Sequence, residues 1–243
     1  MRWALVLLLA GCGRIGFDPA TTGDGGTGDG DPADAVDALR GAAPTRSQCN
    51  YTAVTSSPTM LETTLGSPVL ASEVIFVAIG WNDAISVVTT VTDTTGDTFT
   101  PAQAVQRGGA MSQQVYLALT PQGGANKIAV VFSQAVPNPS VRVCIYAGVK
   151  QTDLPATVGA GGNGTFAVSG TVTTVVPNEL VIASVVGTSN AGLDLAFVTA
   201  INTTPLGHVV EEHVAPMPRN MQASASFGPT SDWVIVLSSL QPF

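Results

Sequence analysis

Between Ser47 and Phe243 the sequence consists of short runs of apolar and β-branched residues, and none of them keeps the 3.6-residue period of a helix. Residues 85–92 and 112–120 alternate apolar and polar side chains, which is typical of strands with one buried face. Residues 74–79 and 180–186 are apolar on both faces, which is typical of central strands. About a dozen such strands, with no helix between them, predict an all-β fold. We expect a two-sheet antiparallel β-sandwich of jelly-roll type, in one domain over residues 47–243.

Glycine, proline, asparagine and aspartate separate the predicted strands, and the glycine-rich residues 160–164 are among the predicted turns. The sequence also contains four short motifs at strands and turns, namely Trp81-Asn82-Asp83, residues 91–102, Tyr146-Ala147-Gly148-Val149 and Trp233-Val234-Ile235-Val236. They resemble a group of secreted bacterial β-sandwich domains, often attached to larger extracellular proteins. The resemblance covers most of the domain, implies the sandwich fold and assigns no catalytic residue.

The N-terminal residues have the composition of an export signal. Arg2 precedes an apolar run over residues 4–9 that is too short to cross a bilayer as a helix of about 20 residues. Its length fits the hydrophobic region of a signal peptide. Leu9-Ala10-Gly11-Cys12 resembles the bacterial lipobox, which implies a signal peptide over residues 1–11 and three acyl chains on Cys12. The alternative is an ordinary cleaved signal peptide with an unmodified cysteine.

Residues 12–46 are expected to form a flexible tether. The Gly/Asp/Thr-rich residues 21–31 have no large apolar side chains, so they cannot bury enough surface to offset the entropy of ordering. Such a tether would reach about 30–35 Å. An exported protein held at the cell envelope by lipidated Cys12 is the predicted result. Gly13, in place of an aspartate after the cysteine, favours the outer membrane over the inner one.

The chain is acidic, with 17 Asp and Glu against 9 Lys and Arg and a formal net charge of −8. Both the tether and the domain share this excess. Because nucleic-acid binding needs a basic surface, the charge argues against DNA or RNA as a partner. It also disfavours anionic lipid surfaces.

Cys49 and Cys144 remain once Cys12 is assigned to lipid. Two leftover cysteines in an oxidising compartment most often pair, so we expect a disulfide between them. The alternation over residues 141–147 places Cys144 on an outward face beside Arg142 and Tyr146, so the bridge would cross the outside of the sheet. Two free thiols are the alternative.

Few residues could serve acid–base catalysis. His208 and His213 have no GxSxG motif beside them. Glu211 and Glu212 are adjacent, so on a strand they point to opposite faces and cannot form the facing carboxylates of a glycosidase. Glu211 and His213 share a face and could form a small polar pair, although a solvated strand face is the simpler explanation. A polysaccharide-acting enzyme would need distant acids to converge in a groove, with candidates Asp83, Asp93, Glu211 and Glu212.

Ligand sites of two further kinds are conceivable. Asp93 and Asp97 flank a turn and could contribute oxygen ligands to Ca²⁺, the one cofactor considered, although aspartate is also common in turns for its backbone hydrogen bonds. Trp81, Tyr116 and Tyr146 could stack on a sugar, the two tyrosines from a shared outward patch, whereas core packing is the alternative for Trp81.

These observations predict a non-enzymatic, lipid-anchored β-sandwich at the cell surface that binds or organises a polysaccharide or an envelope protein. A polysaccharide-acting enzyme and a calcium-assisted carbohydrate-binding module remain the alternatives.

Overall fold

The computed structural model describes residues 41–192 and 194–243, which contain seventeen strands and no helix that could cross a membrane. The strands are β1 (Thr45–Ala53), β2 (Met60–Thr64), β3 (Glu73–Trp81), β4 (Val88–Asp93), β5 (Thr100–Pro101), β6 (Gln106–Gly108), β7 (Met111–Ala118), β8 (Lys127–Phe132), β9 (Ser140–Ala147), β10 (Ala156–Val168), β11 (Val172–Thr173), β12 (Glu179–Gly187), β13 (Ala191–Gly192), β14 (Val198–Asn202), β15 (Val209–Ala215), β16 (Asn220–Met221) and β17 (Ser224–Leu240). The signal peptide, Cys12 and most of the predicted tether lie outside the described residues.

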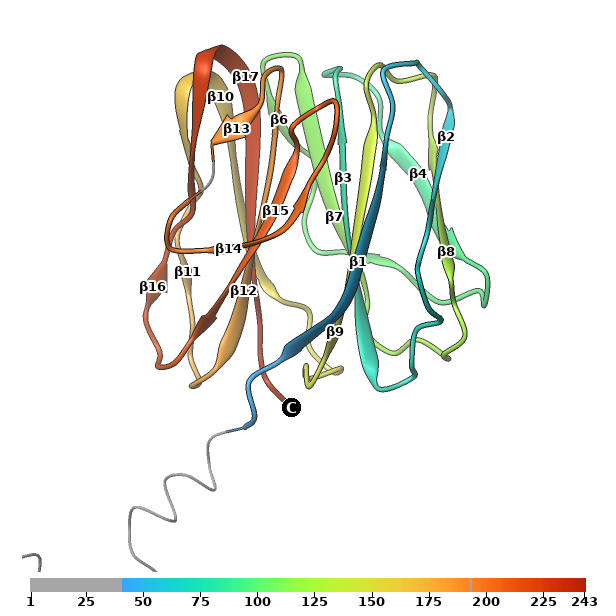
Figure 1. The fold of residues 1–243 in the computed structure, drawn as a ribbon, viewed down its shortest axis with the longest axis vertical. Helices are drawn as coiled ribbons and strands as arrows, with labels where there is room; N and C mark the ends of the chain where they lie inside the picture. Colours follow the sequence, from blue (N-terminus) through green and yellow to red (C-terminus); the bar gives the residue numbers. More distant parts are fainter. Residues whose placement is uncertain (1–40, 193) are drawn as a thin grey trace, which may run out of the picture. The chain divides into compact units, whose positions relative to one another are not determined.

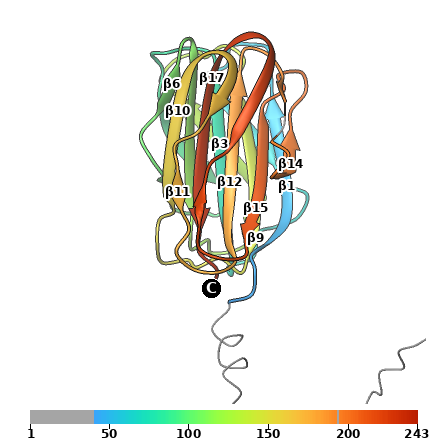
Figure 2. The same cartoon turned by 90° about the vertical axis from the view of Figure 1, so that its left-hand side faces the viewer.

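The strands form two large and two small antiparallel sheets. The first large sheet has the order β1-β9-β3-β7-β5, with β6 also paired to β7, and the second has the order β10-β17-β12-β15-β14, with β13 paired to β17. The first small sheet is β2-β8-β4 and the second is β11-β16. The predicted antiparallel β-sandwich is therefore confirmed. Figure 2 faces the second large sheet, whose strands lie side by side from β10 at one edge to β14 at the other.

The sheets stack in layers, with the two large sheets face to face at the centre (Figure 1). One face of the first large sheet packs on the first small sheet through residues such as Ile75 and Ile128. Its other face packs on the second large sheet, where Phe76 and Ile182 share a core. A third core, which includes Val181 and Met221, lies on the outer face of the second large sheet. Because both faces of each large sheet are covered, their central strands are buried throughout, as β3 and β12 are.

The two halves of the domain, residues 45–147 and 156–240, have the same strand order. In each half the first strand pairs with the last, and that last strand also pairs with the central strand β3 or β12. In the first half β2, β4 and β8 of the small sheet come between strands of the large sheet along the chain, as in a jelly roll. In the second half β10 and β17 bend past a bulge at Gly164 to serve both layers. The two halves thus duplicate one strand arrangement, which the sequence analysis missed.

The two central strands, β3 and β12, begin with the same hydrogen-bonding pattern around a glutamate. Glu73 accepts a hydrogen bond from the backbone N–H of Leu70, three residues earlier, at 2.8 Å. Glu179 accepts the equivalent bond from Val176 at 2.8 Å. A serine hydroxyl donates to each carboxylate as well. Both glutamates lie at the same end of the domain, where β1 begins and β9 and β17 end, and we call this the proximal end and the opposite one the far end.

Residues 160–164 are strand rather than the predicted turn, because they form the middle of β10 beside β17. Their glycines serve a close contact between the halves. A Cβ atom on Gly161 would lie 2.2 Å from the carbonyl oxygen of Arg107, and one on Gly108 would lie 2.0 Å from that of Trp233. The backbones of β6 and β10 therefore approach each other where no other side chain fits.

This contact predicts the effect of a single methyl group. We expect Gly161→Ala to lower the free energy of unfolding by about 3 kcal/mol, because the new Cβ meets backbone atoms that cannot turn away. Urea denaturation measures the change. Gly228→Ala is the matched control, since its Cβ has no neighbour within 4 Å and should leave stability unchanged within about 1 kcal/mol. Equal losses in the two variants would contradict the close contact.

Candidate functional site

Two of the three aromatic residues proposed for sugar stacking are buried, which corrects that expectation. Trp81 is 0% exposed and packs edge-on against Phe132 in the first core, at 5.6 Å between ring centroids. Tyr146 is buried on the opposite face of the sheet and donates a hydrogen bond to Glu212 at 2.9 Å. Burial and the charge of Glu212 raise the pKa of Tyr146 well above its usual range. Both rings are inside because layers cover each face of the first large sheet.

Tyr116 is half-buried against the first core, whereas Tyr146 belongs to the core between the large sheets. The two tyrosines therefore do not form the shared outward patch that was expected. Burial raises the pKa of Tyr116.

Asp93 and Asp97 lie close together because both belong to the same turn. One oxygen of Asp93 accepts bonds from the backbone N–H groups of Thr95, Gly96 and Asp97 at 2.7–3.1 Å. Partial burial acts to raise the pKa of Asp93, but these hydrogen bonds outweigh it and the pKa is below its usual value. Asp97 accepts a bond from the backbone of Gln122 at 2.8 Å. The geometry is that of turn chemistry, and among the described residues no three His, Cys, Asp or Glu side chains gather as metal ligands.

The acids considered for catalysis stand apart. Asp83 lies at the far end, just after β3, and accepts bonds from the backbone of Ile85 and Ser86 at 2.7 and 2.6 Å. Asp93 lies at the proximal end of β4. Glu212 forms an ion pair with Arg46 at 3.3 Å. Each carboxylate therefore serves its own loop or a pair across strands, and they do not converge on one groove.

Glu211 and Glu212 point to opposite faces of β15, as predicted, and Glu211 faces the outer core. It is 1% exposed, and its one hydrogen bond among the described residues comes from the backbone of Asp194 at 3.3 Å. Burial raises the pKa of Glu211 to about 7, and the nearby charge of Asp194 acts in the same direction. His213 instead contacts the carbonyl oxygen of Ala196 at 2.9 Å, and the described residues show no hydrogen bond between Glu211 and His213.

The raised pKa of Glu211 predicts a pH effect on stability. Between pH 4.5 and pH 7 the folded chain keeps a proton on Glu211 that the unfolded chain has lost, so ionisation costs the folded state and stability falls as the pH rises. Between pH 4.5 and pH 7 we expect the free energy of unfolding to fall by about 1–3 kcal/mol more in wild type than in Glu211→Gln. Urea denaturation at both pH values measures it. Glu62→Gln is the control, because Glu62 forms an exposed ion pair with Lys127, and its stability should change with pH as that of wild type does. If the stability of Glu211→Gln also changed with pH as in wild type, the role of Glu211 would be contradicted.

A buried polar cluster lies between the two large sheets. The guanidinium of Arg142 donates to the carbonyl oxygens of Val185 and Val209 at 3.1 and 2.8 Å and to Gln113 at 2.8 Å. Gln113 also exchanges hydrogen bonds with Ser184 from the second half. Burial lowers the pKa of Arg142 to about 9, so the side chain stays charged at neutral pH. The cluster therefore links the halves through hydrogen bonds from Arg142 and Gln113 in the first half to Val185, Val209 and Ser184 in the second.

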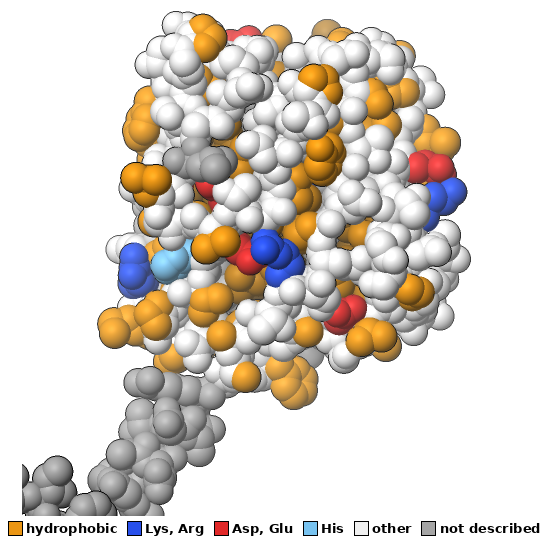
Figure 3. Space-filling model, viewed as in Figure 1, with side chains coloured by type: hydrophobic (Ala, Val, Ile, Leu, Met, Phe, Trp, Pro, Cys, Tyr) orange, Lys and Arg blue, Asp and Glu red, His pale blue; other side chains and the backbone are white. Residues whose placement is uncertain are grey.

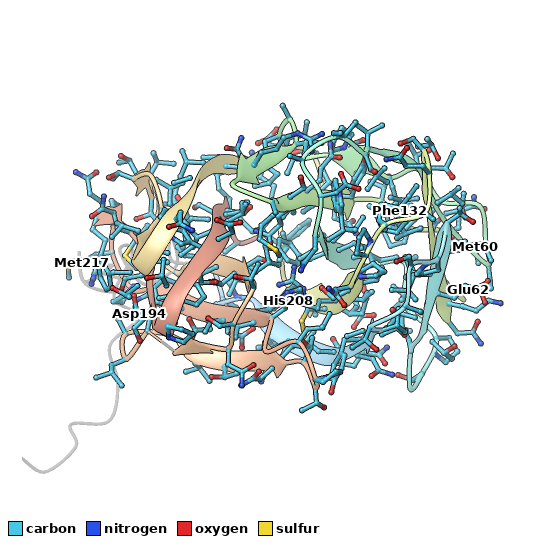
Figure 4. The ribbon with its side chains drawn as sticks, turned by 90° about the horizontal axis from the view of Figure 1, so that it is seen from above. Met60, Glu62, Phe132, Asp194, His208 and Met217 are labelled. Atoms are coloured by element: carbon cyan, nitrogen blue, oxygen red, sulfur yellow. A yellow bond between two sulfur atoms is a disulfide. The ribbon has the colours of Figure 1, made fainter. Side chains whose placement is uncertain are left out.

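Ser140 and His208 belong to the same interface and lie 2.8 Å apart. Figure 4 shows His208 in the middle of the molecule, between the layers. Both residues are buried, and burial together with the charge of Arg142 lowers the pKa of His208 to about 3. The imidazole is out of reach of a substrate, and its low pKa makes it a weak base, so the geometry fits a structural pair.

Three adjoining hollows open at the proximal end. The first has a volume of about 350 Å³ and shares Lys150 and Gln241 with the second, of about 360 Å³. The second shares Phe243 with the third, of about 250 Å³. The lining residues come from the loop that joins the halves and from the ends of β12 and β17, with Leu154, Val175 and Glu179 around the first hollow.

The charges around the first hollow are already engaged. Lys150 forms an ion pair with Asp153 at 2.5 Å, and the carboxylate of Glu179 is occupied by backbone N–H groups and Ser239. The hollows can therefore accept neutral or apolar groups rather than position an acid and a base. The sequence analysis missed them, because segments far apart in the sequence build their walls, as Ser72 and Phe243 do around the third hollow.

Comparisons of the chain with protein families, with curated proteins and with solved structures found no match.

Proposed function

We propose that the protein is a non-enzymatic module of the cell envelope, anchored by lipid on Cys12, which binds or organises an envelope polysaccharide or protein. The observation that carries the proposal is that the candidate catalytic acids Asp83, Asp93, Glu211 and Glu212 lie apart. Asp83 and Asp93 serve turns at opposite ends of one half, and Glu212 is paired with Arg46. Glu211 is buried on another face. Hydrolysis of a polysaccharide needs two carboxylates across one cleft, about 5–9.5 Å apart.

The disulfide supports a place outside the cytoplasm. Cys49 on β1 lies opposite Cys144 on β9, and the two sulfur atoms are bonded. Structural disulfides persist in oxidising compartments and are rare in the cytosol of most organisms. The bridge agrees with the export signal in residues 1–11, and Cys12 itself lies outside the described residues.

Two measurements test the anchor. When the full chain is expressed in a bacterium, we expect it in the membrane fraction, with a mature N-terminus at Cys12 that carries acyl chains by mass spectrometry. Cys12→Ser should move the protein out of the membrane fraction, because the substitution removes the acyl chains that stable anchoring needs. A mature chain that begins elsewhere and carries no lipid would overturn the anchoring.

The absence of catalysis is tested with envelope polysaccharides. We expect no release of reducing ends when the purified chain is incubated with them, and retention of a bound polysaccharide or envelope protein in co-sedimentation. Reducing ends that appear with wild type and vanish with Asp83→Asn or Glu211→Gln would overturn the proposal.

A further inference from the structure

Apolar side chains protrude from loops at the proximal end. Leu70, Leu154 and Val175 precede β3, β10 and β12, and Met217 follows β15, so each belongs to a loop at this end. These four side chains are between 50% and 63% exposed. Figure 3 shows hydrophobic side chains along the lower margin of the described domain, which is the proximal end.

Hydrogen bonds and a shared hollow join these loops into one surface. Leu154 and Val175 line the same hollow. Gln151, from the loop of Leu154, donates to the carbonyl oxygen of Ala71, the residue after Leu70. Thr174, beside Val175, is hydrogen-bonded to Arg219, two residues after Met217. The four side chains therefore project from neighbouring loops, with the hollows between them.

Few free charges accompany this surface, and exposed Arg219 is the arginine there that forms no ion pair among the described residues. Lys150 is paired with Asp153, and the carboxylates of Glu73 and Glu179 are buried and hydrogen-bonded. The Asp93–Asp97 turn lies at the same end of the first half, but its oxygens accept backbone N–H groups. Such a surface is not basic, so it fits neutral, zwitterionic lipid rather than anionic lipid.

The chain enters the domain on the same surface. Gly41, the first described residue, lines the second hollow with Lys150 and Phe243. Only residues 13–40 separate it in the sequence from Cys12, the residue proposed to carry the lipid. We infer that the proximal end rests on a lipid bilayer, with Leu70, Leu154, Val175 and Met217 inserted among zwitterionic lipids. The inference rests on the proposed anchoring through Cys12.

A bilayer fits this surface better than a second copy of the chain. Separate protruding side chains with hollows between them enter a fluid interface without any need for shape complementarity, whereas a protein partner needs closely matched surfaces. The anchor would also hold this end at a high local concentration of lipid, so weak insertion of four side chains is sufficient.

The experiment uses the lipidated full chain, purified from membranes and reconstituted into phosphatidylcholine vesicles that contain brominated acyl chains, which quench tryptophan. Leu154→Trp reports on the proximal end, and Val175→Trp repeats the measurement from another loop. Ile85→Trp is the matched control, because Ile85 is exposed in the loop after β3 at the far end. Wild type supplies the background from Trp81 and Trp233.

We expect about a two-fold loss of the added emission for Leu154→Trp and Val175→Trp, since insertion places the rings at the acyl boundary. Ile85→Trp should be unquenched. Vesicle-bound chains in which neither proximal tryptophan is quenched would overturn the inference and leave the anchoring intact. Equal quenching at both ends would overturn it as well, because the domain would then have no fixed face. A chain that does not stay with the vesicles would overturn both the anchoring and the inference.

Discussion

Cys49→Ala combined with Cys144→Ala is expected to lower the free energy of unfolding by about 4–5 kcal/mol, the stabilisation that the chain-entropy model gives for a long closed loop. The bridge spans 95 residues and so constrains nearly the whole first half in the unfolded chain. It also ties β1, an edge strand of the first large sheet, to β9. Urea denaturation of the double variant measures the loss, and hydrogen exchange should show β1 among the strands that open first.

Two controls accompany the disulfide variant. Cys12→Ser removes a cysteine outside the bridge and should leave the stability of the domain unchanged. Wild type in reductant under denaturing conditions should reproduce the loss of the double variant. Denaturation midpoints that do not differ between wild type and the double variant would show that the bridge contributes nothing.

Arg142→Ala is expected to lower the free energy of unfolding by about 3–5 kcal/mol, a cost typical of breaking a buried polar network. The substitution removes the donors to Val185, Val209 and Gln113 and leaves these acceptors buried between the large sheets. It also opens a cavity in the interface. Because the acceptors lie in both halves, the loss measures how strongly the halves depend on each other.

Two further variants separate the causes. Arg142→Met restores most of the volume without the donors, so we expect it to recover only part of the loss. Arg46→Ala removes a half-exposed arginine and its ion pair with Glu212 and should cost less than about 1 kcal/mol. Equal stabilities of Arg142→Ala and Arg46→Ala would contradict the role of the buried cluster.

Several strands could be predicted from local sequence alone. Residues 74–79 and 180–186 were predicted as central strands, and they lie within β3 and β12. Apolar and β-branched runs between turn residues are sufficient for this, since they reflect the burial of each strand. The same reasoning wrongly predicted a turn at the glycine-rich residues 160–164. Glycines are needed there for a close backbone contact with β6, which no local sequence pattern reveals.

The side-chain faces were predicted less well. The alternation in β9 correctly separated Val143 and Ile145 from Cys144 and Tyr146, but both sets are buried. A single sandwich leaves one face of each sheet in water, whereas here the second large sheet covers that face. The shared start of the central strands, Glu73-Val74-Ile75 and Glu179-Leu180-Val181, was the available signal of a duplication. A duplication implies two such sheets, and therefore a face on each that can be buried against the other.

Of the candidate sites, too, only some could be predicted from the sequence. The pairing of Cys49 with Cys144 was predicted from cysteine count and compartment, and the structure confirms it. The proximal hollows were not predicted, because Lys150, Glu179 and Gln241 meet only after both halves have folded.

The sequence by itself determined the all-β class, the antiparallel sandwich, most strand positions and the disulfide pair, since each depends on residue type and on neighbours a few positions away. Only the tertiary structure decided that two jelly-roll halves pack through their large sheets, that Trp81 and Tyr146 are inside, and that apolar loops gather at the proximal end. These features depend on contacts between residues far apart in the sequence, such as Gly161 with Arg107 and Gln113 with Ser184. The free energy of such contacts comes from surfaces buried against each other, and a linear pattern of apolar and polar residues does not specify which surfaces meet.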